Sequence, residues 1–210
     1  MLSSIVLTSL QTDVLVGTLL GDACMEREKP THNPRIRFDQ TYPGHEKYLL
    51  SLYEIFKDLT GTPPRIYTRK PDKRTNKIYK TIAFKSLRYP CLNYYYDLFY
   101  KYDELNKRYK VVPNNIKELL NARSLAYWIM DDGGIDVFKA THLNTDKFTL
   151  NDINLLQVAL KENFELRTRI IKKRQEQWAI VIPIRQIQSL ASIVGPYMHN
   201  TMAYKVKGLI

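Results

Sequence analysis

The chain is short of cysteine, of clustered histidine and of long hydrophobic runs, and each shortage excludes a class of protein. Two cysteines in 210 residues, Cys24 and Cys91, cannot supply a disulfide framework, and they favour a reducing compartment. The four histidines are scattered without the spacing of a zinc site. No apolar run approaches the roughly 18 residues that span a bilayer, and residues 1–20 lack the basic start of a signal peptide. We therefore expect no membrane partner.

Acidic residues are also few. Asp and Glu together number 21 against 32 Lys and Arg, which gives a formal net charge of +11 at pH 7. A balance of this sign makes an anionic polymer such as nucleic acid the natural partner, although charge alone is weak support. The hydrophobic fraction of 44% and the charged fraction of 25% are those of a folded globular protein, and the length allows one large domain or two small ones.

The most informative stretch is an apolar helix that ends in two carboxylates, over residues 124–134. Its apolar residues cover nearly every face of a 3.6-residue period and predict a buried helix: Leu125, Ala126, Trp128, Ile129 and Met130. Asp131 and Asp132 follow at the C-terminus, where the helix dipole disfavours anions, and Gly133 and Gly134 stop the helix. A bound cation would remove this electrostatic conflict.

A second apolar helix of the same kind is predicted over residues 14–23. Thr12 or Asp13 can cap its start, and it ends in an aspartate, Asp22. Two glycines four positions apart lie on one face of this helix: Gly17 and Gly21. Each glycine costs about 1 kcal/mol relative to alanine inside a helix, so the pair indicates close packing by another helix.

The elements around these two helices repeat in the same order. In the first half, the periodicities predict strands over 35–40, 65–69 and 77–86 and helices over 46–59 and 89–99. In the second half, they predict strands over 142–145, 166–172 and 178–184 and helices over 151–164 and 185–194. The triplet Tyr-Lys-Val occurs at 109–111 and again at 204–206. We infer a degenerate internal duplication with halves at 1–113 and 114–210.

These two stretches resemble the two motif copies of single-chain LAGLIDADG homing endonucleases, with Leu15 to Ala23 as the first copy and Leu125 to Gly133 as the second. The chain is similar to the subgroup that contains the yeast mitochondrial omega-intron enzyme. The resemblance implies an α+β fold of two pseudo-twofold-related αββαββα halves, each presenting a curved antiparallel sheet to the DNA major groove. Tyr127 and Trp128 depart from the general motif, so we expect an asymmetric helix interface.

The resemblance also implies roles for individual residues. Asp22 and Asp132 would be the catalytic metal ligands, with the backbone carbonyls of Gly21 and Asp131 as further ligands. The implied metal is Mg²⁺, for which Mn²⁺ or Ca²⁺ can substitute in binding. Lys110 and Lys205 would be the catalytic basic residues near each active site. The positions that pack at the helix interface would be Gly17, Gly21 and Ala126.

A set of basic and aromatic residues on the predicted strands is the candidate DNA-binding surface. On paired strands these side chains would form a basic ribbon that fits the major groove, with arginines directed to guanine and lysines to phosphate. An ordinary solvated face is the alternative. The candidates are Arg35, Arg37, Arg65, Tyr67, Arg69, Lys77, Lys80, Lys85, Arg167, Arg169 and Lys173.

The predicted function follows from the resemblance and from the chemistry of phosphodiester hydrolysis, which needs a hard cation held by oxygen ligands. We expect a monomeric endonuclease that makes a staggered double-strand break, with 3′ overhangs, at a long asymmetric DNA target during intron homing. Two alternatives stay open: an RNA maturase that assists splicing of a group I intron RNA, and a catalytically silent DNA-binding protein. The expected location is a mitochondrion or chloroplast.

Overall fold

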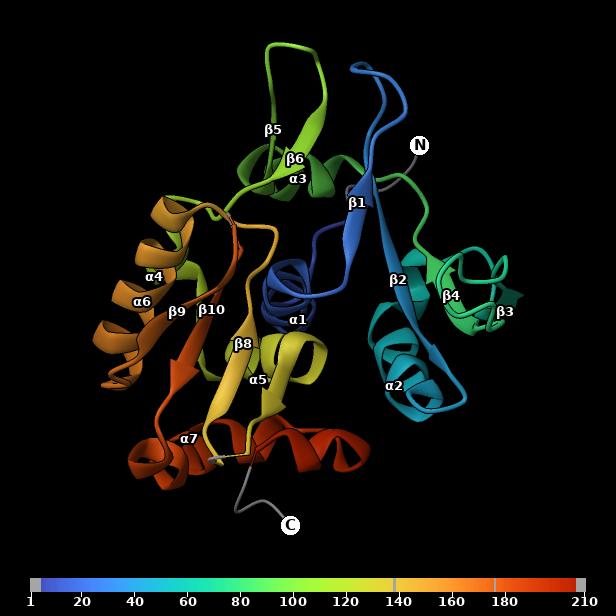
Figure 1. Ribbon diagram of the computed structural model, residues 1–210. Helices are drawn as coiled ribbons and strands as arrows, with labels where there is room; N and C mark the ends of the chain where they lie inside the picture. The colour runs from blue at the N-terminus through green and yellow to red at the C-terminus, as the bar shows by residue number, and fades with distance from the viewer. Residues whose placement is uncertain (1–4, 138, 176, 207–210) are drawn as a thin grey trace. The chain divides into compact units, whose positions relative to one another are not determined.

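The computed structural model describes residues 5–137, 139–175 and 177–206 (Figure 1). The helices are α1 Ser9–Leu20, α2 Glu46–Phe56, α3 Asn93–Phe99, α4 Ile116–Leu119, α5 Ala122–Asp132, α6 Leu150–Phe164 and α7 Ile187–Val194. The strands are β1 Cys24–Glu26, β2 Arg35–Tyr42, β3 Arg65–Thr68, β4 Lys80–Lys85, β5 Tyr100–Tyr102, β6 Arg108–Lys110, β7 Gly133–Ile135, β8 Thr141–Asn144, β9 Arg169–Arg174 and β10 Gln177–Ile182. Short 3₁₀ helices cover Lys57–Leu59, Pro90–Leu92, Ile184–Gln186, Gly195–Tyr197 and Asn200–Lys205.

The internal duplication is visible in the topology. The order α1-β1-β2-α2-β3-β4-α3 is repeated as α5-β7-β8-α6-β9-β10-α7. Each copy forms a four-stranded sheet, with strand orders β1-β2-β4-β3 and β7-β8-β10-β9, and every strand pair is antiparallel. The short hairpin of β5 and β6 follows the first copy. The predicted α+β fold with two αββαββα halves is therefore confirmed.

Helix α2 covers one face of the first sheet and leaves the other face open (Figure 1). Alternation along β2 directs Ile36 and Phe38 toward α2, and both are buried. The ring of Phe38 lies 5.0 Å from that of Phe56 on α2 and 4.8 Å from that of Phe84 on β4. The arginines that alternate with Ile36 and Phe38 consequently face away from this core.

Helix α6 has the same role for the second sheet. A capping box starts this helix, because Thr149 accepts a hydrogen bond from the Asp152 amide while Asp152 accepts one from the Thr149 amide. Leu156 and Leu160 on α6 are fully buried, as is Ile180 on β10. The helix predicted over 151–164 is therefore confirmed, and Thr149, one of the two cap positions that the sequence allows, caps it.

Contacts within the chain divide the described residues into two compact units. One contains residues 5–11 and 22–94, and the other contains residues 12–21 and 95–206. The greater part of α1 therefore belongs to the unit that contains α5, and not to the unit of the sheet that follows it in sequence. Both motif helices lie in one unit.

Three predicted starts are wrong, and one of them is that of the strand predicted over 166–172, because β9 begins at Arg169. Helix α1 begins at Ser9, because Thr8 and Gln11 exchange backbone-to-side-chain hydrogen bonds at 3.0 and 3.1 Å and cap it. Thr12 and Asp13 lie inside the helix and do not cap it. The predicted strand over 77–86 begins only at Lys80, where pairing with the last residue of β2 begins, and Ile78 is 61% exposed rather than inward.

The glycines after α5 also differ from the prediction. Gly133 has φ −76° and ψ 154°, so the helix ends by entering strand β7 and not through a left-handed glycine. A Cβ at Gly133 would lie 2.4 Å from the carbonyl oxygen of Ile129, which explains the need for glycine there. Within the described ranges, every helix is too short or too polar to cross a membrane.

Candidate active site and nucleic-acid interface

The two motif helices approach so closely that only glycine fits at two positions of the first motif. A Cβ on Gly17 would lie 2.2 Å from the carbonyl oxygen of Ser124 and 2.9 Å from the Cβ of Tyr127. A Cβ on Gly21 would lie 2.4 Å from the Cβ of Asp131. Ala126, the third residue assigned to the helix interface from the sequence, is fully buried. The absence of a side chain at the two glycines thus lets the backbone and side chains of α5 pack directly against α1 and the turn after it.

Each motif aspartate sits at the end of its helix. Asp132 is the last residue of α5 and is half-buried, and the Asn144 side chain donates a hydrogen bond to its carbonyl oxygen at 3.1 Å. Asp22 lies in the exposed turn after α1. Asp131 is buried against the first motif, so its carboxylate is less accessible than that of Asp132.

The side chain of Gln40 orients Asp22. Its amide nitrogen donates to the Asp22 carboxylate at 3.2 Å, and its amide oxygen lies 2.9 Å from Nδ1 of His45. Gln40 is buried on β2, so this chain of hydrogen bonds is fixed by the sheet. Groups that hold a metal-binding carboxylate in this way set its geometry. Sequence reasoning missed Gln40 and His45, since nothing in the spacing relates either of them to Asp22.

Both lysines lie at the carbonyl end of a motif helix. Lys110 donates through Nζ to the carbonyl oxygens of Leu19 and Gly21, at 2.8 and 3.2 Å. Lys205 donates to the carbonyl oxygens of Met130 and Asp131, at 2.5 and 2.8 Å. The helix dipole makes this end negative, so an ammonium group there is stabilising. The positive charge of each lysine therefore offsets the unfavourable negative charge of the aspartate at the helix end, the feature that suggested a bound cation.

Lys205 is the more deeply buried of the two lysines, at 6% exposed, and this predicts an effect on stability. We expect Lys205→Met to lower the free energy of unfolding by about 1–3 kcal/mol, because two carbonyl oxygens in a buried site lose their charged donor. Urea denaturation would measure the change. The matched variant Lys110→Met should lose less, since water can reach the carbonyls around half-buried Lys110. Equal losses in the two variants would contradict this account of Lys205.

The oxygen atoms at these helix ends are of the type that holds a hard cation. Among the residues described, no group of three His, Cys, Asp or Glu side chains forms a metal cluster. Mg²⁺ does not need one, because it keeps several water ligands and is usually bound by one or two carboxylates. A single carboxylate at each helix end, Asp22 at one and Asp132 at the other, is thus the type of ligand that Mg²⁺ takes. The carbonyl oxygens of Gly21 and Asp131 are less suited to bind a metal ion, since each already accepts a hydrogen bond from a lysine.

A small cavity of about 80 Å³ joins groups from both motifs within one unit. Gly21 and Lys110 come from the first half of the sequence, and Asp132 and Asp146 come from the second. The complete lining is Leu20, Gly21, Lys110, Asp132, Asn144, Thr145, Asp146, Lys147 and Phe148. Carboxylates and ammonium groups therefore face the same space, which is the composition expected where a cation and a phosphate meet.

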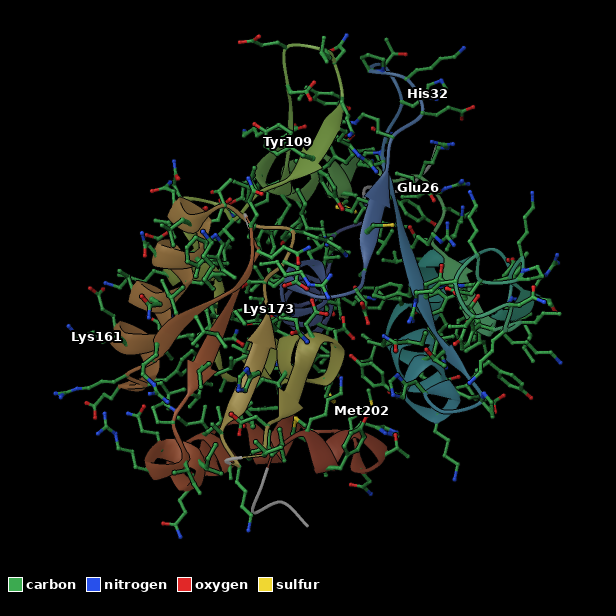
Figure 2. All side chains as sticks on the ribbon, viewed as in Figure 1. Glu26, His32, Tyr109, Lys161, Lys173 and Met202 are labelled. Atoms are coloured by element: carbon green, nitrogen blue, oxygen red, sulfur yellow. The ribbon has the colours of Figure 1, made fainter. Side chains whose placement is uncertain are left out.

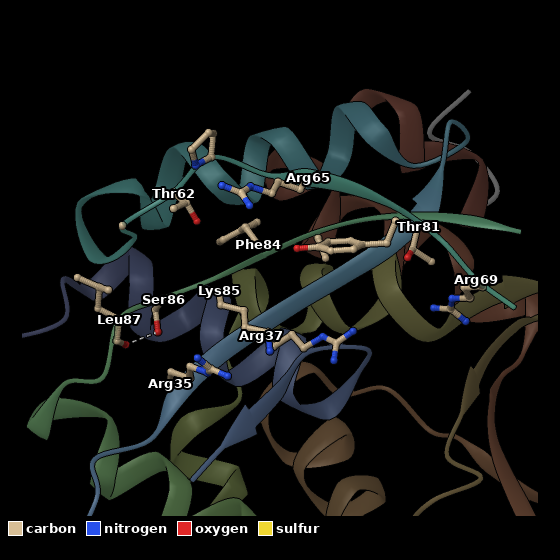
Figure 3. Close-up of a pocket in the computed structure, with 14 residues that line it drawn as sticks. Arg35, Arg37, Thr62, Arg65, Arg69, Thr81, Phe84, Lys85, Ser86 and Leu87 are labelled. Carbon is tan, nitrogen blue, oxygen red and sulfur yellow. Dashed lines mark hydrogen bonds between the residues drawn. The ribbon is translucent and has the colours of Figure 1, made fainter. Parts of the chain in front are cut away.

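The open face of the first sheet carries most of the predicted DNA-binding residues. It forms a groove of about 560 Å³, and Figure 3 shows Arg35 and Arg37 following one another along β2 with Lys85 beside them. Tyr67 in this groove is 52% exposed. We call this surface the arginine face, and define it by the six predicted residues that line it: Arg35, Arg37, Arg65, Tyr67, Arg69 and Lys85.

Two carboxylates that sequence reasoning did not assign to the site lie within the arginine face. Glu26 on β1 (Figure 2) forms salt bridges with Arg35 and Lys85, at 2.8 and 2.9 Å. Asp39 on β2 pairs with Arg37. Burial alone would raise the pKa of Glu26, but hydrogen bonds and charge from Lys85 and Arg35 outweigh it and hold the pKa below its usual value. Glu26 therefore stays ionised at neutral pH.

Two of the predicted residues lie outside the arginine face. Lys80 pairs with Tyr42 and Thr68, and alternation along β4 puts it on the same side as Ile82 and Phe84, which is the side that α2 covers. Lys77 precedes β4, and its carbonyl oxygen accepts from the Asp72 amide in a turn. The structure does not bring these two lysines together with the arginines.

Fewer of the predicted DNA-binding cations lie together on one face of the second sheet. Arg169 and Lys173 share a face of β9 with Ile171, and Lys173 forms a salt bridge with Asp146 at 2.9 Å. Arg167 precedes β9 and lines a separate groove with residues of α6, so it does not join this face. The two sheets therefore offer chemically different surfaces to a partner.

Comparison with known proteins confirms the predicted family. Residues 12–190 match the LAGLIDADG DNA endonuclease family. The chain is 30% identical to DNA endonuclease I-ChuI of Chlamydomonas applanata over 95% of both proteins. It is 31% identical to the cytochrome b mRNA maturase bI2 of Debaryomyces hansenii, over 92% of this chain and 72% of that protein. The structure of the homing endonuclease I-WcaI bound to its DNA recognition sequence shares the fold, with a TM-score of 0.84 at 24% identity over 96% of this chain and 87% of that one. The chain belongs to the LAGLIDADG DNA endonuclease family.

Proposed function

We propose that the chain makes a site-specific, staggered double-strand break in DNA, with 3′ overhangs and with Mg²⁺ as its cofactor. The observation that carries the proposal is the duplicated helix end: an aspartate is the last residue of α5 and another lies in the turn after α1, and a lysine ammonium donates to backbone carbonyls at each end. Two such ends in one chain supply one centre for each DNA strand, so the chain would act as a monomer. The halves 1–113 and 114–210 would each contribute one motif and one sheet.

The residues of the site have separable tasks in this proposal. Asp22 and Asp132 would bind Mg²⁺, which supplies polarisation of the scissile phosphate and activation of water when bound. Gln40 keeps the Asp22 carboxylate in place through its hydrogen bond. Lys110 and Lys205 hold their ammonium groups beside the motif helix ends, where positive charge stabilises the charge that develops on phosphate oxygens.

Double-stranded DNA is the proposed substrate, and the arginine face is its proposed binding surface. Arginine forms bidentate hydrogen bonds to guanine in the major groove, and a two-stranded ribbon fits that groove. The homing endonuclease I-WcaI, which shares this fold, binds its DNA recognition sequence, and this supports a duplex as the partner. Arg169 and Lys173 would give the second sheet fewer phosphate and base contacts than the first.

Cleavage of the intronless allele tests the proposal. A plasmid that carries the joined exons around the host intron should be cut by the chain with Mg²⁺, and the ends should carry 3′ overhangs when sequenced. The same plasmid with the intron present, which splits the target, is the control and should stay intact. Failure to cut the intronless plasmid at any Mg²⁺ concentration would overturn the nuclease proposal.

A maturase role is the second candidate, because one relative is described as a cytochrome b mRNA maturase. In this role the same basic surfaces would bind group I intron RNA and assist its splicing in a mitochondrion or chloroplast. Splicing of the host intron with the Asp22→Asn variant separates the two activities. Splicing that survives the substitution would support an RNA role apart from cleavage, whereas an intron that splices equally well without protein would exclude it.

A further inference from the structure

We propose that Glu26 is a positioning residue for DNA readout: it fixes Arg35 and Lys85 in the arginine face and restrains binding to non-target DNA. This inference rests on the proposed DNA-cleaving function and adds a determinant of specificity to it. A carboxylate on a surface that binds phosphates is unfavourable for affinity alone, because it repels the backbone and neutralises nearby cations. Its presence among the cations of the arginine face therefore needs another explanation.

The carboxylate of Glu26 contacts three cations. Its Oε2 accepts hydrogen bonds from Nε of Arg35 at 2.9 Å and from Nζ of Lys85 at 2.9 Å, and its Oε1 lies 3.1 Å from the same Nζ. A third cation, Arg37, comes within 3.6 Å of Oε1. Strand pairing puts Glu26 directly opposite Arg35, so the backbone register fixes this cluster. Glu26 is thus the anionic centre of the face.

The geometry leaves a defined part of Arg35 for DNA. Nε and Nη2 of the guanidinium both point at Oε2 of Glu26, at 2.9 and 2.8 Å. The opposite edge, formed by Nη1 and the second hydrogen of Nη2, has no partner among the residues that the structure describes. Two parallel N–H groups on one edge are what guanine O6 and N7 accept. A guanidinium held along its other edge loses less rotamer freedom when it makes that contact.

Arg37, one step along the strand, is also held along its Nε edge, although its Nη1 lies 3.6 Å from Oε1 of Glu26. Arg37 directs Nε and Nη2 to a single oxygen of Asp39, with Nε at 2.8 Å. Arg35 and Arg37 are on the same face of β2, two residues apart. Arg65, by contrast, forms no salt bridge within the described part of the chain and is exposed, so its full charge is available to phosphate. The arginine face thus contains two arginines that carboxylates hold in place, Arg35 and Arg37, and one that is not held, Arg65.

Glu26→Gln tests the proposal, with Glu28→Gln as a matched control. Both variants raise the net charge by one, but Glu28 is 65% exposed in the loop after β1 and pairs with Arg88, which does not line the groove. The probes are a duplex selected by the wild-type chain from a randomised library and an unselected duplex of equal length. Affinities would be measured in Ca²⁺ over a range of salt concentrations, with the folding of each variant checked by its melting temperature.

For Glu26→Gln we expect the ratio of affinities for selected and unselected duplex to fall about tenfold, because Arg35 and Lys85 become free to bind any phosphate. The slope of log affinity against log salt for the unselected duplex should steepen by about 1–2 units, the value for one or two further phosphate contacts. Glu28→Gln should leave the ratio unchanged. Glu26→Asp, which keeps the charge but shortens the reach, should preserve the slope while lowering the ratio.

Each outcome bears on one proposal. Equal ratios for Glu26→Gln and Glu28→Gln would overturn the positioning role of Glu26 and leave the nuclease proposal untouched. A Glu26→Asp variant with a wild-type ratio would also overturn it, because charge alone would then suffice. If the wild-type chain selected no sequence from the library and cut no target, the proposed DNA-cleaving function itself would fail.

Discussion

Replacing Asp132 by asparagine is expected to abolish double-strand cleavage while leaving DNA binding intact. Asparagine has the same size as aspartate but lacks the negative charge that a hard cation requires, so one of the two centres would lose its carboxylate ligand. Removal of a single preorganised hydrogen-bond donor from an enzyme site costs on the order of 10²–10³ in rate, and we expect loss of a metal-binding carboxylate to cost at least as much. A supercoiled target plasmid would report the change, because a chain with one working centre nicks it without making it linear.

Stability and binding separate this effect from a folding defect. Removal of a negative charge from the C-terminus of α5 relieves an unfavourable interaction with the helix dipole, so the melting temperature should stay level or rise. Affinity for the target duplex in Ca²⁺ should also be kept. Asp146→Asn is the matched control, since it removes the same charge from the lining of the same cavity. If Asp146→Asn abolished cleavage and Asp132→Asn did not, the assignment of the motif aspartate would be wrong.

Gly17→Ala is expected to destabilise the protein in spite of alanine's better helix propensity. Alanine gains about 1 kcal/mol over glycine inside a helix. The new Cβ, however, would lie 2.2 Å from the carbonyl oxygen of Ser124, which is backbone and cannot rotate away. The two motif helices must then separate, and overpacking of this kind costs about 1–3 kcal/mol or more. After the propensity gain is subtracted, we expect a net loss of up to about 2 kcal/mol, or up to about 4–8 °C in melting temperature.

Gly17→Ala should also lower the cleavage rate. Gly17 and Gly21 contact α5 from one face of the first motif, so a shift at Gly17 displaces the helix end that precedes Asp22. A displacement near 1 Å can cost about 100-fold in rate. Gly44→Ala is the control, because a Cβ there meets nothing within 4 Å. A Gly17→Ala protein with unchanged melting temperature and cleavage rate would refute the close approach of the two helices.

Much of the fold could be predicted from the sequence because the hydrophobic period of a long helix or strand is visible within the segment itself, and the duplication shows the same order of elements twice. The buried helix at Ala122–Asp132 and the strand at Arg35–Tyr42 followed from their apolar patterns. The elements that escaped prediction are short: β1, β5, β6, β7 and α4 have three or four residues each. Such segments contain too few residues for a period to appear, and their structure is decided by pairing with strands distant in sequence.

The candidate site was predicted less completely, and for a related reason. Positions of the motif aspartates and lysines could be compared between the two copies of the repeat. Glu26 and Gln40 have no counterpart that the repeat makes visible, and their importance lies in contacts across strand pairs. Lys80 was predicted on the ribbon although it alternates in phase with Ile82 and Phe84, and the structure puts it on their side of β4. Strand register, which is a tertiary property, decides the cases of Glu26 and Gln40.

The membership of α1 in the second unit has a consequence for biosynthesis. Residues 12–21 find their packing partner, α5, only about 100 residues later in the chain. At a translation rate of about 5–20 residues per second, several seconds pass in which this apolar segment has emerged from the ribosome without its partner. During that interval the first sheet can form, but the helix with its two glycines stays exposed to chaperones and to aggregation. The paired motif helices can therefore form only after the second half of the chain has been synthesised.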